Sequence, residues 1–98
     1  MFNNDDIFVL RQSIDKFGEQ LQFILTQEEC GELIAKLSHY MRFGPTEDCI
    51  ADVIDGIADA QIMLDTLKLI FGADAVDKVR IQKIRRLKNR IEKVAYND

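Results

Sequence analysis

The sequence predicts an all-α protein, a four-helix bundle formed by a single domain over residues 1–98. No segment shows the alternation of apolar and polar residues, bounded by turn signals, that is typical of strands. Helix breakers are few, since the chain has one proline and five glycines. The expected connections of three or four residues imply that successive helices are antiparallel neighbours.

Capping and breaking residues predict where the helices begin and end. Glycines at the ends of apolar stretches, such as Gly18 and Gly72, stop a helix, and Gly44-Pro45 cannot continue one. Thr26 followed by Glu29 resembles a capping box, so a break near residue 26 is a rival boundary. Asn4 or Asp5, Thr46 or Glu47, and Asp74 are the expected starts, giving helices over about residues 4–17, 19–42, 46–71 and 74–95.

Charge and cysteine usage restrict the class of protein. The net charge is −4, from 17 acidic and 13 basic residues, which argues against a nucleic acid polymer as the main partner. Eight Lys or Arg residues and a single acid, Glu92, lie between Lys78 and Lys93. Cys30 and Cys49 form no CxxC pair, and no long apolar run is present. We therefore expect reduced cysteines, no membrane partner and a cytoplasmic location.

The stretch "QEECGELI" places three glutamates, Glu28, Glu29 and Glu32, inside the second expected helix. At 100° per residue Glu28 and Glu32 align with an apolar stripe that includes Leu21, and Glu29 lies at its border. Like charges one turn apart destabilise a helix, and burying them unpaired costs more. Two interpretations stay open: a bound cation beside the glutamates, or a solvated face with the true inner side at Leu33, Leu37 and Tyr40.

The third expected helix carries a stripe of acids at i, i+4, i+7 and i+11: Asp48, Asp52, Asp55 and Asp59. Asp is a poor helix former, so the stripe calls for an explanation. Ordinary amphipathicity is one, because apolar residues occupy the opposite side: Ile50, Val53, Ile54, Ile57 and Leu64. The other explanation is that the stripe forms a second metal-binding face.

The fourth expected helix combines an apolar inward stripe with basic residues. The stripe is Val76, Leu87, Ile91 and Val94, with Lys83 near its centre and Arg86 and Arg90 toward its edge. Lys83 either snorkels or reaches an anion. Two acidic clusters without a nearby His or Cys ligand form an all-oxygen donor set, which suits Mg²⁺, with Mn²⁺ as an alternative, and not Zn²⁺ or Cu²⁺.

These motifs resemble those of the MazG-like all-α nucleoside triphosphate pyrophosphohydrolases, in particular the short single-domain forms of phages and prophages. The resemblance lies in "EECGEL", "IADAQIML" and the Lys/Arg-rich last helix, and covers about residues 20–93. The family pattern is E-x-x-E on one helix and E-x-x-D on the next. Glu29 and Glu32 match the first half and Asp59 ends the second, but Gly56 stands where the pattern has Glu. Asp55 is the nearest acid.

The resemblance implies hydrolysis of a (d)NTP between its α and β phosphates, giving a (d)NMP and pyrophosphate. It implies Mg²⁺ held by Glu29, Glu32 and Asp59, with Asp55 as a further ligand. Glu28 would help to position the attacking water, and Lys83 and Arg86 would neutralise the outer phosphates. It also implies a homodimer or homotetramer in which a partner chain completes the bundle. Because of Gly56, the alternative is a catalytically weakened homologue that acts as a nucleotide-binding or helical interaction and oligomerisation module.

Overall fold

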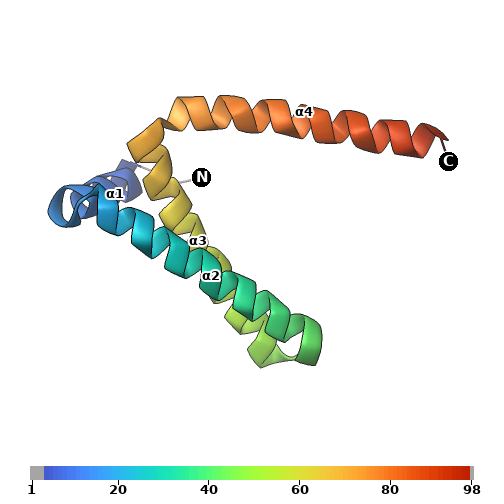
Figure 1. The fold of residues 1–98 in the computed structure, drawn as a ribbon, viewed down its shortest axis with the longest axis horizontal. Coiled ribbons are helices and arrows are strands. Elements are labelled where there is room, and N and C mark those ends of the chain that lie inside the picture. Colours follow the sequence, from blue (N-terminus) through green and yellow to red (C-terminus); the bar gives the residue numbers. More distant parts are fainter. Residues whose placement is uncertain (1–3, 98) are drawn as a thin grey trace.

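The computed structural model describes residues 4–97, and four helices account for nearly all of them (Figure 1). No strand occurs in this part of the chain, so the predicted all-α class is confirmed. The helices are α1 (Asn4–Phe17), α2 (Glu19–Phe43), α3 (Glu47–Phe71) and α4 (Ala73–Asn97).

Local signals set the helix ends as expected. Gly18 and Gly72 adopt positive φ values of 86° and 116°, which other residues rarely adopt, and each ends a helix. Thr46 is the N-cap of α3, where its side-chain oxygen accepts a hydrogen bond from the Cys49 N–H at 3.1 Å. The rival break near Thr26 does not occur: α2 runs through it, and the Thr26 hydroxyl donates to the Gln22 carbonyl at 2.7 Å.

The predicted start of the last helix was wrong by one residue. Asp74 does not cap α4 but lies inside its first turn. Gly72 serves both helices, because its N–H donates to the Lys68 carbonyl of α3 and its carbonyl accepts from the Val76 N–H of α4. The link between α3 and α4 is therefore a single residue.

The centre of the fold is the antiparallel pair of α2 and α3, which lie side by side along most of their length (Figure 1). Small or half-buried side chains of α3 recur at alternating spacings of four and three residues along the contact: Cys49, Val53, Gly56, Ala60 and Met63. The facing residues of α2 have the same spacing: Gln22, Thr26, Glu29, Leu33 and Lys36. This spacing is the one that keeps two long helices in contact.

The first helix closes one end of this pair. It packs against both α2 and α3. The Gln22 side-chain amide of α2 donates to the Ser13 carbonyl and lies 3.2 Å from the Ser13 hydroxyl, so the buried Gln22 fixes α1 across the turn at Gly18.

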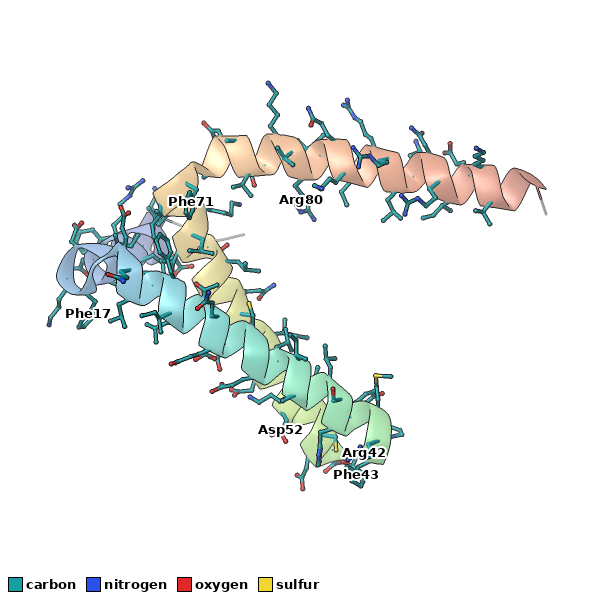
Figure 2. All side chains as sticks on the ribbon, viewed as in Figure 1. Phe17, Arg42, Phe43, Asp52, Phe71 and Arg80 are labelled. Carbon is teal, nitrogen blue, oxygen red and sulfur yellow. The ribbon has the colours of Figure 1, made fainter. Side chains whose placement is uncertain are left out.

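The fourth helix does not complete a bundle within one chain. It leaves α3 at an elbow, and the described residues of α4 pack against α3 alone (Figure 1). Figure 2 shows the side chains of α4 projecting without another helix beside them beyond Arg80. The expected inward stripe is therefore exposed here: Val76, Leu87, Ile91 and Val94. The change of direction between α3 and α4 occurs at Gly72, whose φ is 116°.

The sequence predicts no membrane partner for this protein. Within residues 4–97 no helix combines the length and the apolar character needed to cross a bilayer.

The Thr46 cap provides a test of the α2–α3 connection. We expect Thr46→Ala to lower the free energy of unfolding by about 1 kcal/mol, because the Cys49 N–H loses its acceptor. Thr46→Ser keeps the oxygen and should retain most of the stability. Urea denaturation at fixed protein concentration measures both, and equal losses for the two variants would contradict the role of the hydroxyl.

Candidate carboxylate site

Glu29 lies on the face of α2 that contacts α3. It is half-buried, between Thr26 one turn before it and Leu33 one turn after it. Of the strip predicted as the alternative inner side, Leu33 lies inward, whereas Leu37 and Tyr40 are exposed, as is Leu21. Glu28 and Glu32 are exposed, so Glu29 is the glutamate of "EECGEL" that is drawn most deeply into the helix pair.

Glu29, Glu32 and Asp59 form a cluster of like charges, which we call the carboxylate cluster. The pKa of Glu29 is raised above its ordinary value, first by partial burial and then by the charges of Glu32 and Asp59 and a hydrogen bond with Glu32. Asp59 is itself half-buried on α3. The antiparallel pair therefore brings together the first and last acids of the motif, which are 30 residues apart in the chain.

Asp55 is held by a lysine of the other helix. The Lys36 Nζ lies 3.4 Å from Asp55 Oδ2, with the Lys36 side chain 26% exposed and that of Asp55 72% exposed. The positive charge of Lys36 also acts on Glu29 and lowers its pKa, against the larger effects that raise it. Asp55 is thus linked to the cluster by its ion pair with Lys36, and its carboxylate is not without a partner.

Gly56 lies at a close contact between α2 and α3. It is buried, and a Cβ at this position would be 3.1 Å from Lys36 Cδ and 3.3 Å from Leu33 Cδ1. Both distances are shorter than ordinary van der Waals contact. A glutamate here would have to displace the Lys36 side chain, so the departure from the E-x-x-D pattern and the position of Lys36 are linked.

The donor atoms suit a hard cation, although the side chains do not form a coordination shell as they stand. Within residues 4–97 no three His, Cys, Asp or Glu side chains are close enough together to hold a metal ion. The carboxylate oxygens of the cluster are the ligand type that Mg²⁺ and Mn²⁺ prefer. Glu29, Glu32 and Asp59 would have to rotate inward to share one ion. Glu28 is not among the charges that shift Glu29.

The structure does not bring Lys83 and Arg86 to this cluster within one chain. Both are exposed on α4, past the elbow, and no described residue of α4 packs against α2 (Figure 1). Lys83 and Arg86 therefore lie apart from the carboxylates of their own chain, and their role at the site stays a prediction that needs a second chain.

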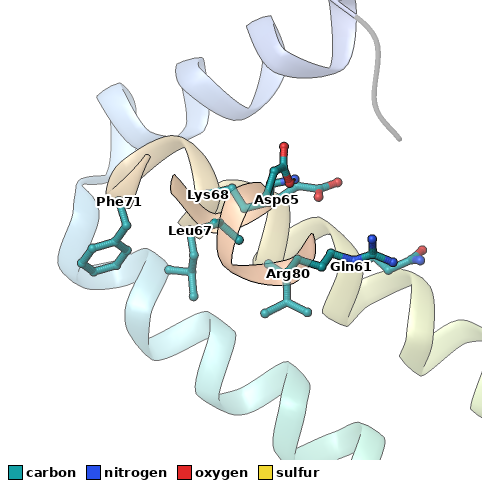
Figure 3. A pocket seen from close by; sticks show the side chains of 9 residues that line it. Gln61, Asp65, Leu67, Lys68, Phe71 and Arg80 are labelled. Atoms are coloured by element: carbon teal, nitrogen blue, oxygen red, sulfur yellow. The ribbon is translucent and has the colours of Figure 1, made fainter. Parts of the chain in front are cut away.

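The inside of the elbow holds a groove of about 560 Å³ (Figure 3). The ion pair between Lys68 Nζ and Asp77 Oδ1, at 2.7 Å, joins its two walls. Its lining is mainly apolar and comes from α3 and the first turns of α4: Gln61, Leu64, Asp65, Leu67, Lys68, Phe71, Val76, Asp77 and Arg80. The groove is distinct from the carboxylate cluster, because the two share no residue.

Sequence reasoning missed Lys36. It lies four residues after Glu32 and seven after Glu29, so helical spacing places it on the same face as both. That spacing could have identified Lys36 from the sequence. Its contact with Asp55 and the space left by the missing side chain of Gly56 depend on the neighbouring helix.

Both cysteines are free, as expected.

Comparisons of the chain with protein-family models, with characterised proteins and with solved structures return no match. The assignment of a function therefore rests on the residues of the site itself.

The raised pKa of Glu29 predicts how a variant should respond to pH. The folded chain holds the Glu29 proton more tightly than the unfolded chain, so ionisation of Glu29 destabilises the fold as the pH rises past the ordinary pKa of glutamate. We expect Glu29→Gln to melt at a higher temperature than the wild type at neutral pH, with the difference disappearing below about pH 4.

Thermal unfolding followed by circular dichroism, with EDTA present, measures this difference. Glu28→Gln removes the same charge one residue away and is the matched control. If the wild type instead melted at a higher temperature than Glu29→Gln at neutral pH, the predicted destabilisation by ionised Glu29 would be contradicted.

Proposed function

We propose that this chain is a Mg²⁺-dependent nucleoside triphosphate pyrophosphohydrolase of the MazG-like type, acting on (d)NTPs in the cytoplasm. The observation that carries the proposal is the carboxylate cluster, in which Glu29 and Glu32 of α2 lie close enough to Asp59 of α3 to raise the pKa of Glu29. Like charges in such a cluster repel one another, and a bound cation would offset that repulsion. The cluster contains the E-x-x-E and terminal Asp residues of the family pattern.

Each residue of the cluster has a stated role in this proposal. Glu29, Glu32 and Asp59 would hold Mg²⁺, which would supply neutralisation of phosphate charge and activation of a water molecule. Glu28, exposed at the edge of the cluster, orients the attacking water toward the α-phosphorus. Asp55 fixes Lys36 beside the carboxylates and supplies no direct ligand in this arrangement.

Lys83 and Arg86 enter the proposal through oligomerisation. In a homodimer or homotetramer, α4 of one chain packs on the helix pair of another and brings these two cations to its carboxylates. Charge supports this arrangement, since α2 and α3 together carry ten acids and three bases, whereas α4 carries three acids and eight bases. So does the exposed apolar seam of α4, spaced by three and four residues: Ile84, Leu87, Ile91 and Val94.

A second candidate function is a nucleotide-binding or helical interaction module without turnover. Gly56 and the Lys36–Asp55 ion pair favour it, because they leave the cluster with fewer free carboxylates than the family pattern provides. The two candidates differ in one observable, the release of pyrophosphate.

A turnover assay tests the leading proposal. Incubation with each (d)NTP and Mg²⁺ or Mn²⁺ should release pyrophosphate and the monophosphate, and Glu32→Gln should reduce the rate by at least about a hundredfold because a ligand is lost. Glu19→Gln, which removes a charge at the start of α2, is the control and should retain activity. Nucleotide binding without turnover would favour the second candidate, and neither binding nor turnover would contradict both.

The oligomer has a separate test. We expect the wild type to be a dimer or tetramer by size-exclusion chromatography with light scattering, and Leu87→Glu to shift it to the monomer by placing a charge in the apolar seam. Gln82→Glu adds a charge on the opposite side of α4 and should leave the assembly intact. A monomeric wild type at micromolar concentration would contradict the proposed assembly.

A further inference from the structure

The α2–α3 pair has two unlike sides, one on each flank of the line along which the helices touch. One flank, which we call the acidic side, carries the ion pair between Lys36 and Asp55. On the other flank the ring of Phe23 on α2 stacks with the ring of Phe71 on α3, with the ring centroids 5.6 Å apart. Steps of 100° per residue from these two contacts assign the remaining residues to one flank or the other.

The flank with the two rings, which we call the apolar side, presents large apolar side chains that are 36% to 84% exposed. They are Phe23, Ile34, Leu37 and Met41 of α2 and Ile50, Ile54, Ile57, Leu64 and Phe71 of α3. Helical spacing places the charged residues within 23–41 and 50–64 on the acidic side or along the helix contact: Glu28, Glu29, Glu32, Lys36, Asp52, Asp55 and Asp59. Such a continuous uncharged surface marks an interaction site.

The extent of the apolar side matches what a stable protein contact needs. Its exposed side chains present roughly 800 Å² of apolar surface, when a large side chain offers about 150–250 Å² in full. Each partner of a stable complex buries about 800 Å². The surface is therefore large enough to hold two folded chains together.

Charge selects the occupant of the apolar side. The apolar seam of α4 is bordered by Lys83, Lys88 and Arg90, which need carboxylates opposite them, and those carboxylates lie on the acidic side. A basic helix is thus a poor cover for the apolar side. The surface that matches it in both size and lack of charge is the same surface of a second copy.

The elbow opens toward the apolar side. Leu64 and Phe71 belong both to this side and to the lining of the elbow groove (Figure 3). The last helix therefore leaves α3 on the side where the second copy would lie. A second copy seated there reaches the groove, and α4 of each chain extends toward its partner.

We propose that the apolar side is the contact between two copies of this chain. The two apolar sides pack face to face about a twofold axis, so that α2 and α3 of both copies form one four-helix bundle and the acidic sides stay outside. The inference deepens the proposed function and rests on it only for self-association, since it requires neither a metal nor turnover.

Ile57→Glu in the full chain tests this contact. Ile57 lies in the middle of the apolar side on α3 and is 42% exposed, so the helix pair should tolerate the change. We expect the dissociation constant, measured by sedimentation equilibrium, to rise at least about a hundredfold, because the dimer would bury an unpaired carboxylate. Circular dichroism checks that the variant remains helical.

Ile24→Glu is the matched control. Ile24 is similarly exposed, at 46%, but helical spacing places it on the face of α2 turned away from α3. This variant should associate as tightly as the wild type. If Ile57→Glu should fail to fold, Ile34→Glu puts the same charge at a more exposed position of the apolar side, 66% exposed, and should dissociate in the same way.

Cross-linking gives a second readout. Cys30 lies on the apolar side, seven residues after Phe23 and seven before Leu37, so the two copies of Cys30 should lie near the twofold axis. A short bismaleimide should link the wild type into covalent dimers. The link should be lost in Cys30→Ser and kept in Cys49→Ser, because Cys49 is buried.

The outcomes separate this contact from the proposed reaction. A monomeric wild type, an Ile57→Glu or Ile34→Glu variant that folds and associates like the wild type, or covalent dimers in Cys30→Ser would overturn the inference. Loss of the dimer in Ile57→Glu but not in Leu87→Glu would support the apolar side and contradict the α4 contact of the proposed function. The expected dimer in a chain that releases no pyrophosphate would support the apolar side and contradict the pyrophosphohydrolase.

Discussion

The close antiparallel approach of α2 and α3 is the contact from which the remaining features of this structure follow. Small residues of α3, with Gly56 and Ala60 buried, let the backbone of α2 lie near that of α3. The same contact places Glu29 near Asp59 and the Lys36 side chain next to Gly56. A larger residue at position 56 would widen the pair, and both the carboxylate cluster and the cation beside it would change.

The helix pair holds like charges together at a cost in stability. Glu29 is half-buried beside two other carboxylates, and its raised pKa records the unfavourable interaction. Lys36 offsets part of it. Shifted pKa values among clustered titratable groups are common at binding sites, and this is the ground for the divalent cation in the proposed function.

The elbow at Gly72 separates the basic part of the chain from the acidic part. The described residues of α4 leave α3 at Gly72, do not pack against α2 and leave the apolar seam exposed. Opposite charges on α4 and on the α2–α3 pair make a second copy the natural partner for that seam in the proposed assembly. The site as proposed is thus a property of the oligomer, with carboxylates from one chain and Lys83 and Arg86 from another.

Local chemistry in the sequence was enough to predict the helix class and nearly all helix ends, because caps such as Thr46 and stops such as Gly18 act within one turn. The MazG-like pattern in the sequence pointed to Glu29, Glu32 and Asp59 as members of one site, and in the structure the charges of Glu32 and Asp59 act on Glu29. Their role as metal ligands stays a prediction. The inward face of α2, the pairing of Asp55 with Lys36 and the divergence of α4 were decided by the tertiary structure. Each of these depends on which backbone lies opposite, and helical periodicity along a single segment carries no information about the neighbouring helix.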